Sequence, residues 1–213
     1  LQAHGNRMSS HPRVPSSSTH VNMVVALKAE ARPLIARYDL KPAGQSGFYS
    51  SGDLGLSLVI SGVGRINASR AVERIHQDGA DDTPAAWLNI GIAGHGTALP
   101  GTALLADEVL ERASGRRLYP RGEGGVPSAL TTTPLCTVDE PEAVYQPGWA
   151  YDMEGSGFLD AAIRISASRP VQCLKIVSDG PKHSSKALTA AVVEELVASC
   201  LEAVDSVLDA ANP

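Results

Sequence analysis

Short apolar runs alternate with segments of helical periodicity along most of the chain, beginning at Val21. A short apolar run bounded by turn residues predicts a buried strand, and apolar residues recurring with the helical period predict an amphipathic helix. These patterns predict strands at 21–27, 47–51, 54–61, 86–92, 103–111 and 171–178, and helices at 30–38, 66–77 and 184–210.

Turn residues separate these segments. Gly52-Asp53 predicts a turn, and residues 115–127, rich in Gly, Arg and Pro, predict a loop that borders the functional site. Strands separated by helices favour a mixed, largely parallel sheet with helices on both faces. Ligands of such sheets bind beyond the carboxyl ends of the strands, so candidate chemistry is sought there.

Composition narrows the partner to a small molecule. The 213 residues suit a single domain, predicted at 21–213. A formal net charge of -5 argues against a broad nucleic-acid surface, which needs clustered Lys and Arg in excess. With 43% hydrophobic and 19% charged residues, the chain has the composition of a globular protein.

Cysteine spacing and apolar runs suggest a cytoplasmic protein. The three cysteines lack the paired CxxC spacing of a zinc or redox site, and no metal is expected. No apolar run approaches the roughly 20 residues of a membrane span, and no signal-peptide segment is evident. Residues 1–20 lack periodicity and are expected to form a flexible leader; Leu1–Arg7, before Met8, are interpreted as a vector-derived remnant.

Five segments near the predicted strand ends carry unusual residues. They are Ala-Leu-Lys-Ala-Glu (26–30), Ser-Gly-Val-Gly-Arg (61–65), Asn-Ile-Gly-Ile-Ala-Gly (89–94), Tyr-Asp-Met-Glu-Gly-Ser-Gly-Phe (151–158) and Ile-Val-Ser-Asp-Gly (176–180). In this order the segments resemble the family of 5'-methylthioadenosine/S-adenosylhomocysteine nucleosidases and their relatives, the nucleoside phosphorylases and hopanoid-associated phosphorylases. The resemblance runs from about residue 21 to residue 209.

The resemblance implies a three-layer α/β/α sandwich. It also implies an enzyme that cleaves a purine ribonucleoside, with adenine as the expected base, and that needs no metal or organic cofactor. It also implies a homodimer. Glu30 matches the carboxylate that activates water, and Asp179 matches the general acid that protonates the purine at N7. Substrate-binding positions implied by the resemblance are Met153 and Glu154 at the ribose, Ser178 at the purine, and Gly64, Ile92 and Gly94.

The proposed chemistry suits these residue types. Cleavage of a glycosidic bond creates positive charge on the sugar and negative charge on the departing base. An acid beside the base and carboxylates beside the sugar therefore lower the barrier, roles that Asp179 and Glu154 can fill.

Each carboxylate also has a structural interpretation that the sequence leaves open. Glu30 suits the N-terminus of a helix, Glu154 a buried ion pair, and Asp179 a turn or helix cap. Met153 suits a hydrophobic core equally well. His95 and His183 are interpreted as loop histidines without a catalytic role.

Two other function classes remain as alternatives. Gly62-Val63-Gly64 begins a dinucleotide-binding fingerprint, but Asn67 replaces its third glycine and the next strand lacks the acidic residue that would bind an adenosine ribose, which disfavours an oxidoreductase. A non-catalytic nucleoside-binding protein is the second alternative, since a fold can persist after its chemistry is lost.

The nucleophile is predicted to be water. Phosphorylases of the family usually carry an Arg and a Ser or Thr where this chain has Ile90 and Ile92, so donors for phosphate are missing. Phosphorolysis, with phosphate as co-substrate, remains the alternative, because Arg65, Arg116, Arg117 and Arg121 could fold over an anion. The region between Glu111 and Pro147 is short for the family, and this leaves the 5' substituent of the nucleoside open.

Overall fold

The computed structural model describes residues 20–78, 84–122, 126–166 and 168–211, so the predicted leader lies almost entirely outside the described residues. Its strands are β1 (Val21–Val25), β2 (Lys41–Pro42), β3 (Phe48–Ser51), β4 (Leu56–Ile60), β5 (Ala86–His95), β6 (Ala103–Glu111), β7 (Arg116–Leu118), β8 (Thr131–Thr137), β9 (Ala150–Asp152) and β10 (Val171–Asp179). Its helices are α1 (Lys28–Arg37), α2 (Arg65–Asp78), α3 (Gly155–Ile165), the 3₁₀ turn η1 (Ser185–Ala187), α4 (Ala190–Ser199) and α5 (Leu201–Ala210).

The strands form one mixed sheet in the order β10-β6-β8-β9-β5-β1-β4-β3-β2, with β7 on β6. Because β10 also pairs with β5, the strands β5, β9, β8, β6 and β10 close into a barrel, from which β1, β4, β3 and β2 extend. Five of the ten strand pairings in the described part of the chain are parallel. The mixed central sheet was predicted correctly, whereas a largely parallel sheet in a plain three-layer sandwich was not.

Strand β5 links the two parts of the sheet. Over its first half it pairs in parallel with β1, and from Trp87 to Gly94 it pairs in parallel with β10. At its end, Gly94 and His95 pair with β9 in the antiparallel direction, and this contact closes the barrel. Buried side chains along nearly all of β5 explain why a continuous apolar run, rather than alternation, identified this strand in the sequence.

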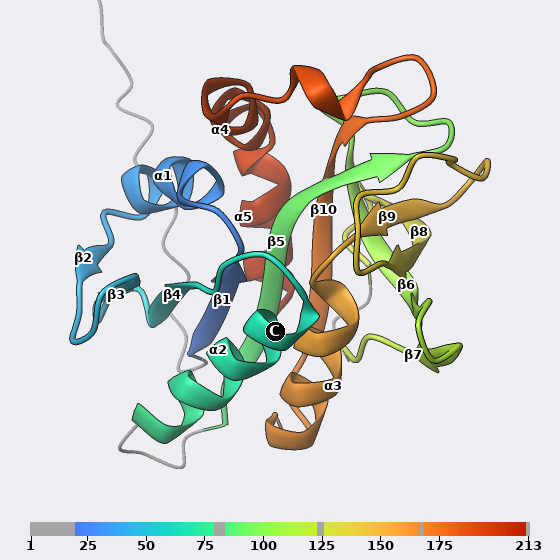
Figure 1. Cartoon of the computed structure of the whole chain (residues 1–213). Coiled ribbons are helices and arrows are strands. Elements are labelled where there is room, and N and C mark those ends of the chain that lie inside the picture. Colours follow the sequence, from blue (N-terminus) through green and yellow to red (C-terminus); the bar gives the residue numbers. More distant parts are fainter. Residues whose placement is uncertain (1–19, 79–83, 123–125, 167, 212–213) are drawn as a thin grey trace, which may run out of the picture.

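Helices cover both faces of the sheet (Figure 1). Helices α2 and α3 contact each other on one face, and α1 contacts α4 and α5 on the other. Each set has its own buried cluster: one centred on α1, α5 and the strands β1, β4, β5 and β10, and one centred on α2 and α3. The sheet is therefore buried from both sides, as the alternation of strands and helices predicted.

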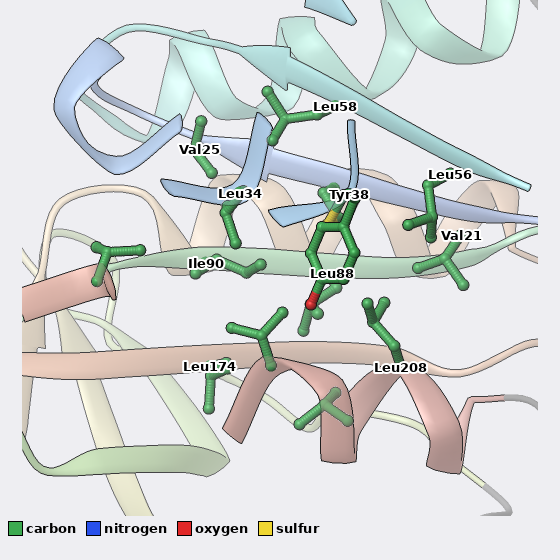
Figure 2. Close-up of a cluster of buried hydrophobic side chains, with 14 of the residues drawn as sticks. Val21, Val25, Leu34, Tyr38, Leu56, Leu58, Leu88, Ile90, Leu174 and Leu208 are labelled. Atoms are coloured by element: carbon green, nitrogen blue, oxygen red, sulfur yellow. The ribbon is translucent and has the colours of Figure 1, made fainter. Parts of the chain in front are cut away.

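The first cluster shows how the helices are held (Figure 2). Leu34 of α1, Leu88 of β5 and Leu208 of α5 are almost fully buried in it. Complete burial of one such side chain contributes about 1.5–3 kcal/mol. The hydroxyl of Tyr38 donates to Oδ1 of Asp205 at 2.7 Å, so α1 is tied to α5 by a polar contact at the edge of the apolar one.

Three predictions of local structure were wrong. The single helix expected at 184–210 is two helices, because the backbone of Cys200 (φ -110°, ψ 14°) leaves the helical conformation between α4 and α5. The loop expected at 115–127 contains β7, which pairs with the end of β6. The segment around Pro134, assigned no element, is β8; its pairing with β6 shifts register at Pro134, where a proline lacks the N–H of a regular ladder.

Candidate active site

The carboxylate of Glu30 is anchored by backbone N–H groups from two elements. Its Oε2 accepts hydrogen bonds from the N–H groups of Ala26 (2.9 Å) and Leu27 (2.8 Å), which lie just before α1. Its Oε1 accepts one from the N–H of Ile92 in β5 (2.9 Å). The structural interpretation of Glu30 as a helix N-terminal residue is thus correct, and the same side chain also reaches the end of β5.

Glu30 packs closely against the backbone of β5 at Gly91. Glu30 is 2% exposed, and burial raises its pKa although the N–H groups of Ile92 and Leu27 oppose the shift. A Cβ atom at Gly91 would lie 3.1 Å from Oε1 of Glu30 and 3.6 Å from Nζ of Lys175. Ile92 therefore contributes its N–H group to the site, and Gly91 allows a carboxylate and an ammonium group to approach the strand.

Lys175 is the principal site residue that the sequence analysis missed. It lies in β10, and its Nζ is 2.8 Å from Oδ2 of Asp152 and donates to Oδ1 of Asn89 at 2.6 Å. Burial opposes its charge, yet the attraction of the nearby acids, Asp152 and Glu154 among them, prevails and raises the pKa of Lys175. A buried, charged lysine thus lies among the carboxylates. The signal available in the sequence was a single Lys within the apolar run of β10.

Asp152 links this lysine to the start of α3. Its Oδ1 accepts a hydrogen bond from the hydroxyl of Thr137 (2.7 Å), and its Oδ2 accepts one from the N–H of Gly155 (2.7 Å). The first residue of the Asp-Met-Glu segment thus fixes the position of the third, Glu154, which directly precedes Gly155.

Glu154 faces the turn between β4 and α2. Its Oε1 accepts a hydrogen bond from the N–H of Gly64 at 2.8 Å. Gly64 has φ +104°, a conformation that side-chain-bearing residues rarely adopt. Burial, and then the charge of Asp152, raise the pKa of Glu154 to about 7, while Lys175 and the N–H of Gly64 act in the opposite direction. Burial and the neighbouring acid thus favour the protonated form of Glu154 more than in a free glutamate.

Asp179 ends β10 beside Gly94 of β5, with which it is in register. The hydroxyl of Ser178 donates to its Oδ1 at 2.5 Å, and the hydroxyl of Tyr145 donates to its Oδ2. Both carboxylate oxygens thus accept hydrogen bonds from hydroxyl groups, one of them from the neighbouring Ser178. Tyr145 was not identified from the sequence, because it lies in the segment whose correspondence with the family was least clear.

Met153 is half-buried and packs, like Tyr145 and Trp149, against a small buried cluster of Cys136, Val138 and Tyr151. Its position between Asp152 and Glu154 brings it to the same end of the sheet. The structural interpretation of Met153 as a packing residue fits these contacts, and its contact with a ribose stays a prediction.

The predicted residues form two neighbouring groups along β5. Glu30 and Glu154, held by the N–H groups of Ile92 and Gly64, lie close to Lys175, whereas Ser178 and Asp179 lie beside Gly94. Ile92 and Gly94 are two residues apart on one strand, a spacing of roughly 6–7 Å. The two groups of side chains therefore lie close together at the carboxyl ends of β1, β5 and β10.

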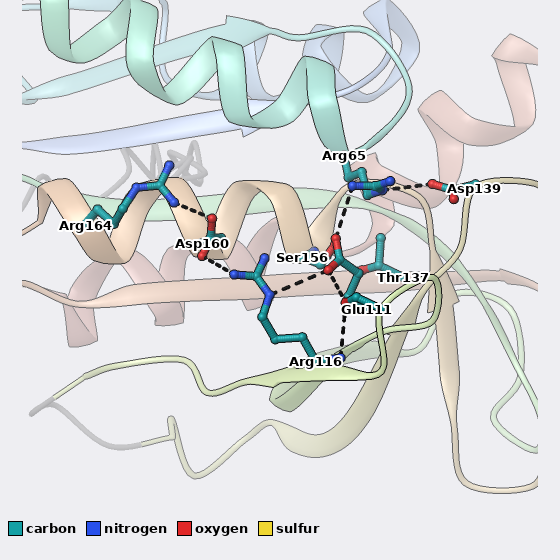
Figure 3. Close-up of polar contacts among 9 residues, drawn as sticks. Arg65, Glu111, Arg116, Thr137, Asp139, Ser156, Asp160 and Arg164 are labelled. Carbon is teal, nitrogen blue, oxygen red and sulfur yellow. Dashed lines mark hydrogen bonds and ion pairs between the residues drawn. The ribbon is translucent and has the colours of Figure 1, made fainter.

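The arginines considered for an anion site pair with carboxylates instead (Figure 3). Arg65 lies 2.9 Å from Asp139 and 3.2 Å from Glu111, and Arg116 lies 2.7 Å from Asp160 and 3.6 Å from Glu111.

Neither of the other two arginines is placed over the site. Arg117 pairs with Glu108. The backbone of Arg121 pairs with Val171, at the opposite end of β10 from Asp179. Arg65, Arg116 and Arg117 thus already have anionic partners.

Three further expectations concern the rest of the described chain. His95 is not a loop residue: it is buried in β5, and its Nδ1 accepts hydrogen bonds from Thr97 and Ala98. The three cysteines are buried and unpaired, and within residues 20–211, apart from the undescribed gaps, no group of three His, Cys, Asp or Glu side chains is placed to hold a metal. Among the described helices, none combines the length and apolar character needed to cross a membrane.

Comparison with protein families and with curated proteins gave no match. Comparison with solved structures gave several. A 5'-methylthioadenosine/S-adenosylhomocysteine nucleosidase from Colwellia psychrerythraea in complex with adenine has a TM-score of 0.69 at 18% identity, covering 92% of this chain and 95% of the other. The 5'-methylthioadenosine nucleosidase of Arabidopsis thaliana has a TM-score of 0.70 at 20% identity, covering 87% and 96%.

Futalosine hydrolase of Helicobacter pylori has a TM-score of 0.74 at 12% identity, covering 90% of this chain and 97% of the other. The chain therefore has the fold of these nucleosidases over nearly its whole described length, as the resemblance in its motifs implied.

Proposed function

We propose that this protein is an enzyme that hydrolyses the N-glycosidic bond of a purine ribonucleoside, with adenine as the released base. The observation that carries the proposal is the grouping of Glu30, Glu154 and Asp179 around β5 in a fold shared with nucleosidases. The adenine complex of one such nucleosidase favours adenine as the base. The proposed reaction requires no metal and no organic cofactor.

Glu30 activates the attacking water in this proposal. A general base must be held in place and must prefer its proton enough to remove one from water. Three backbone N–H groups hold the carboxylate, and burial raises its pKa. Lys175 stabilises the nearby negative charges, so Glu30 and Glu154 can approach the same sugar.

Glu154 binds the ribose hydroxyls. Oε1 is fixed by the N–H of Gly64, and this leaves Oε2 to accept a hydrogen bond from the sugar. As the glycosidic bond breaks, positive charge develops on the ribose, and an ionised Glu154 stabilises it. Met153 packs against the sugar ring in this arrangement.

Asp179 acts as the general acid toward N7 of the purine, with Ser178 holding its other oxygen. Protonation of the base removes the negative charge that would otherwise develop on the leaving group. A positioned general acid contributes a factor on the order of 10² to 10⁴ in rate.

Water is the proposed nucleophile. Phosphate would need several cationic or hydroxyl donors, whereas Arg65, Arg116 and Arg117 are paired with acids and Ile92 presents only its N–H, which Glu30 occupies. Ile90 is fully buried in the core and donates nothing. Phosphorolysis is therefore the less favoured alternative.

A panel of adenine nucleosides, assayed for free base by chromatography in phosphate-free buffer and in millimolar phosphate, tests the function. We expect adenine and a free ribose derivative in both buffers. Ribose-1-phosphate formed only with phosphate would make the enzyme a phosphorylase, and binding without turnover would make it a nucleoside-binding protein.

Asp179→Asn should lower turnover at least 100-fold. The matched control is Asp53→Asn, at an exposed turn.

The homodimer stays a proposal. Val63 and Ile66, at the turn that carries Gly64, are 45% and 58% exposed and supply an apolar surface next to the site. A second copy of the chain could cover it. Light scattering coupled to size-exclusion chromatography should give twice the 22.2 kDa mass of the chain, and a monomer would contradict this expectation.

A further inference from the structure

Tyr145 packs against the end of β5 through several contacts. It lies in the segment 138–149 between β8 and β9. A Cβ atom at Gly94 would lie 2.3 Å from Cε1 of Tyr145, so the ring rests directly on the strand where a side chain would otherwise project. The ring also meets Tyr151 edge-on, with 5.6 Å between centroids and 79° between planes.

The hydroxyl of Tyr145 is hydrogen-bonded to one oxygen of the proposed acid, Asp179. It donates to Oδ2 of Asp179, while Ser178 donates to Oδ1. Burial and the hydrogen bond to Asp179 raise the pKa of Tyr145, so the phenol remains a donor at neutral pH. Purine N7 is a hydrogen-bond acceptor and must be met by a donor. The phenol of Tyr145 therefore occupies the position from which a base would approach Oδ2 of Asp179.

We propose that Tyr145 is a gate over Asp179. In the ligand-free protein its hydroxyl is hydrogen-bonded to the carboxylate, and a purine must displace this hydroxyl to bind Asp179. The proposal rests on the proposed function of Asp179. The purine base then competes for Asp179 with the phenol of Tyr145, which lies in the segment 138–149.

The backbone of this segment is held on both sides of Tyr145. Val144, next to Tyr145, is 75% exposed, and Gly148 at the far end has φ +77°. The near end is held by Glu142, which pairs with Arg112 and accepts hydrogen bonds from the N–H groups of Ala143 and Val144. Beyond the tyrosine, the N–H of Gln146 donates to the hydroxyl of Tyr151 at 3.1 Å, so the hydroxyl of Tyr145 is displaced by rotation of its side chain rather than by movement of the segment.

Tyr145→Phe separates the hydroxyl from the ring. It removes the hydrogen bond that competes with the purine, so we expect adenine to bind about tenfold more tightly by calorimetry, given the usual strength of a hydrogen bond to a charged group. In turnover the same gain should appear as a lower KM. Tyr119→Phe, at a 58% exposed tyrosine, is the matched control and should change neither quantity.

The outcomes distinguish the gate from the proposed function. Unchanged or weaker adenine binding by Tyr145→Phe in a protein that cleaves nucleosides would overturn the gate alone. A lower kcat without tighter binding would make the hydroxyl an assistant of the acid and would also overturn the gate. Tighter adenine binding without any turnover would support the gate and contradict hydrolysis. If neither adenine, hypoxanthine nor guanine binds to either protein, both proposals fail.

Discussion

The ammonium group of Lys175 lies 2.8 Å from the carboxylate of Asp152, and the two side chains are 1% and 0% exposed. Such a buried pair contributes little net stability compared with apolar residues, but removal of one partner leaves a charge without compensation. Lys175 also offsets the charges of Glu30 and Glu154, so its loss would affect three carboxylates.

Lys175→Met should therefore lower the free energy of unfolding by about 3–5 kcal/mol, measured by urea denaturation. The double variant Lys175→Met/Asp152→Asn should recover part of this loss, because the unpaired charge is then gone. Lys186→Met, at an exposed lysine, is the control. A loss below about 1 kcal/mol for the single variant would show that Lys175 does not compensate the charges of these carboxylates.

Glu154→Gln should distinguish ribose from deoxyribose. The carboxylate is proposed to grip a ribose hydroxyl, so kcat/KM should fall by about tenfold or more for a ribonucleoside and far less for its 2'-deoxy counterpart. Parallel assays of the two nucleosides measure the effect. Equal losses on both substrates would remove Glu154 from the 2'-hydroxyl.

Glu154 should also make stability depend on pH. Its pKa rises from 4.5 to about 7 on folding, so its contribution is fully present below pH 4.5 and is lost as the pH rises through 7. The loss between pH 5 and pH 8 should be about 3 kcal/mol at most. Urea denaturation of the parent and of Glu154→Gln at the two pH values isolates this residue, since the remaining groups are common to both. Parallel pH profiles would contradict the assignment.

Gly157→Ala should disturb both packing and sugar recognition. Its Cβ would lie 1.9 Å from the carbonyl oxygen of Arg65, so α2 and α3 must separate and the N–H of Gly64 must move from Glu154. We expect a loss of about 1–3 kcal/mol in the free energy of unfolding and a raised KM. Gly52→Ala, where a Cβ would meet no atom within 4 Å, is the control. A variant as stable as the parent would show that the helices are not locked at this contact.

The alternation of strands and helices could be predicted because each element buries a continuous run or a regular face. Strand β6 has the predicted bounds, Ala103–Glu111. The barrel could not be predicted, because closure depends on β8 and β9: β9 has three residues, and β8 contains a proline that hides its strand pattern. The break at Cys200 was hidden for the opposite reason, since α4 and α5 share one apolar face against the same core.

Only some residues of the candidate site could likewise be predicted from the sequence. The carboxylates Glu30, Glu154 and Asp179 could be chosen as candidates because each lies in one of the five segments that carry the family resemblance. Lys175 looked like an interruption in a buried strand, and its partner Asp152 is distant in sequence. Tyr145 lies in a connecting segment without periodicity, where only the folded chain reveals what the side chain contacts.

Strand β5 joins the open part of the sheet to the barrel, and one short stretch of it, Ile92 to Gly94, meets both Glu30 and Asp179. The distance between the candidate base and the candidate acid is consequently a property of one covalent segment, independent of any movement between domains. Insertions or deletions in the connections on either side can then alter which nucleoside is admitted without changing that distance. The segment 138–149 before β9, which carries Tyr145, is one such connection.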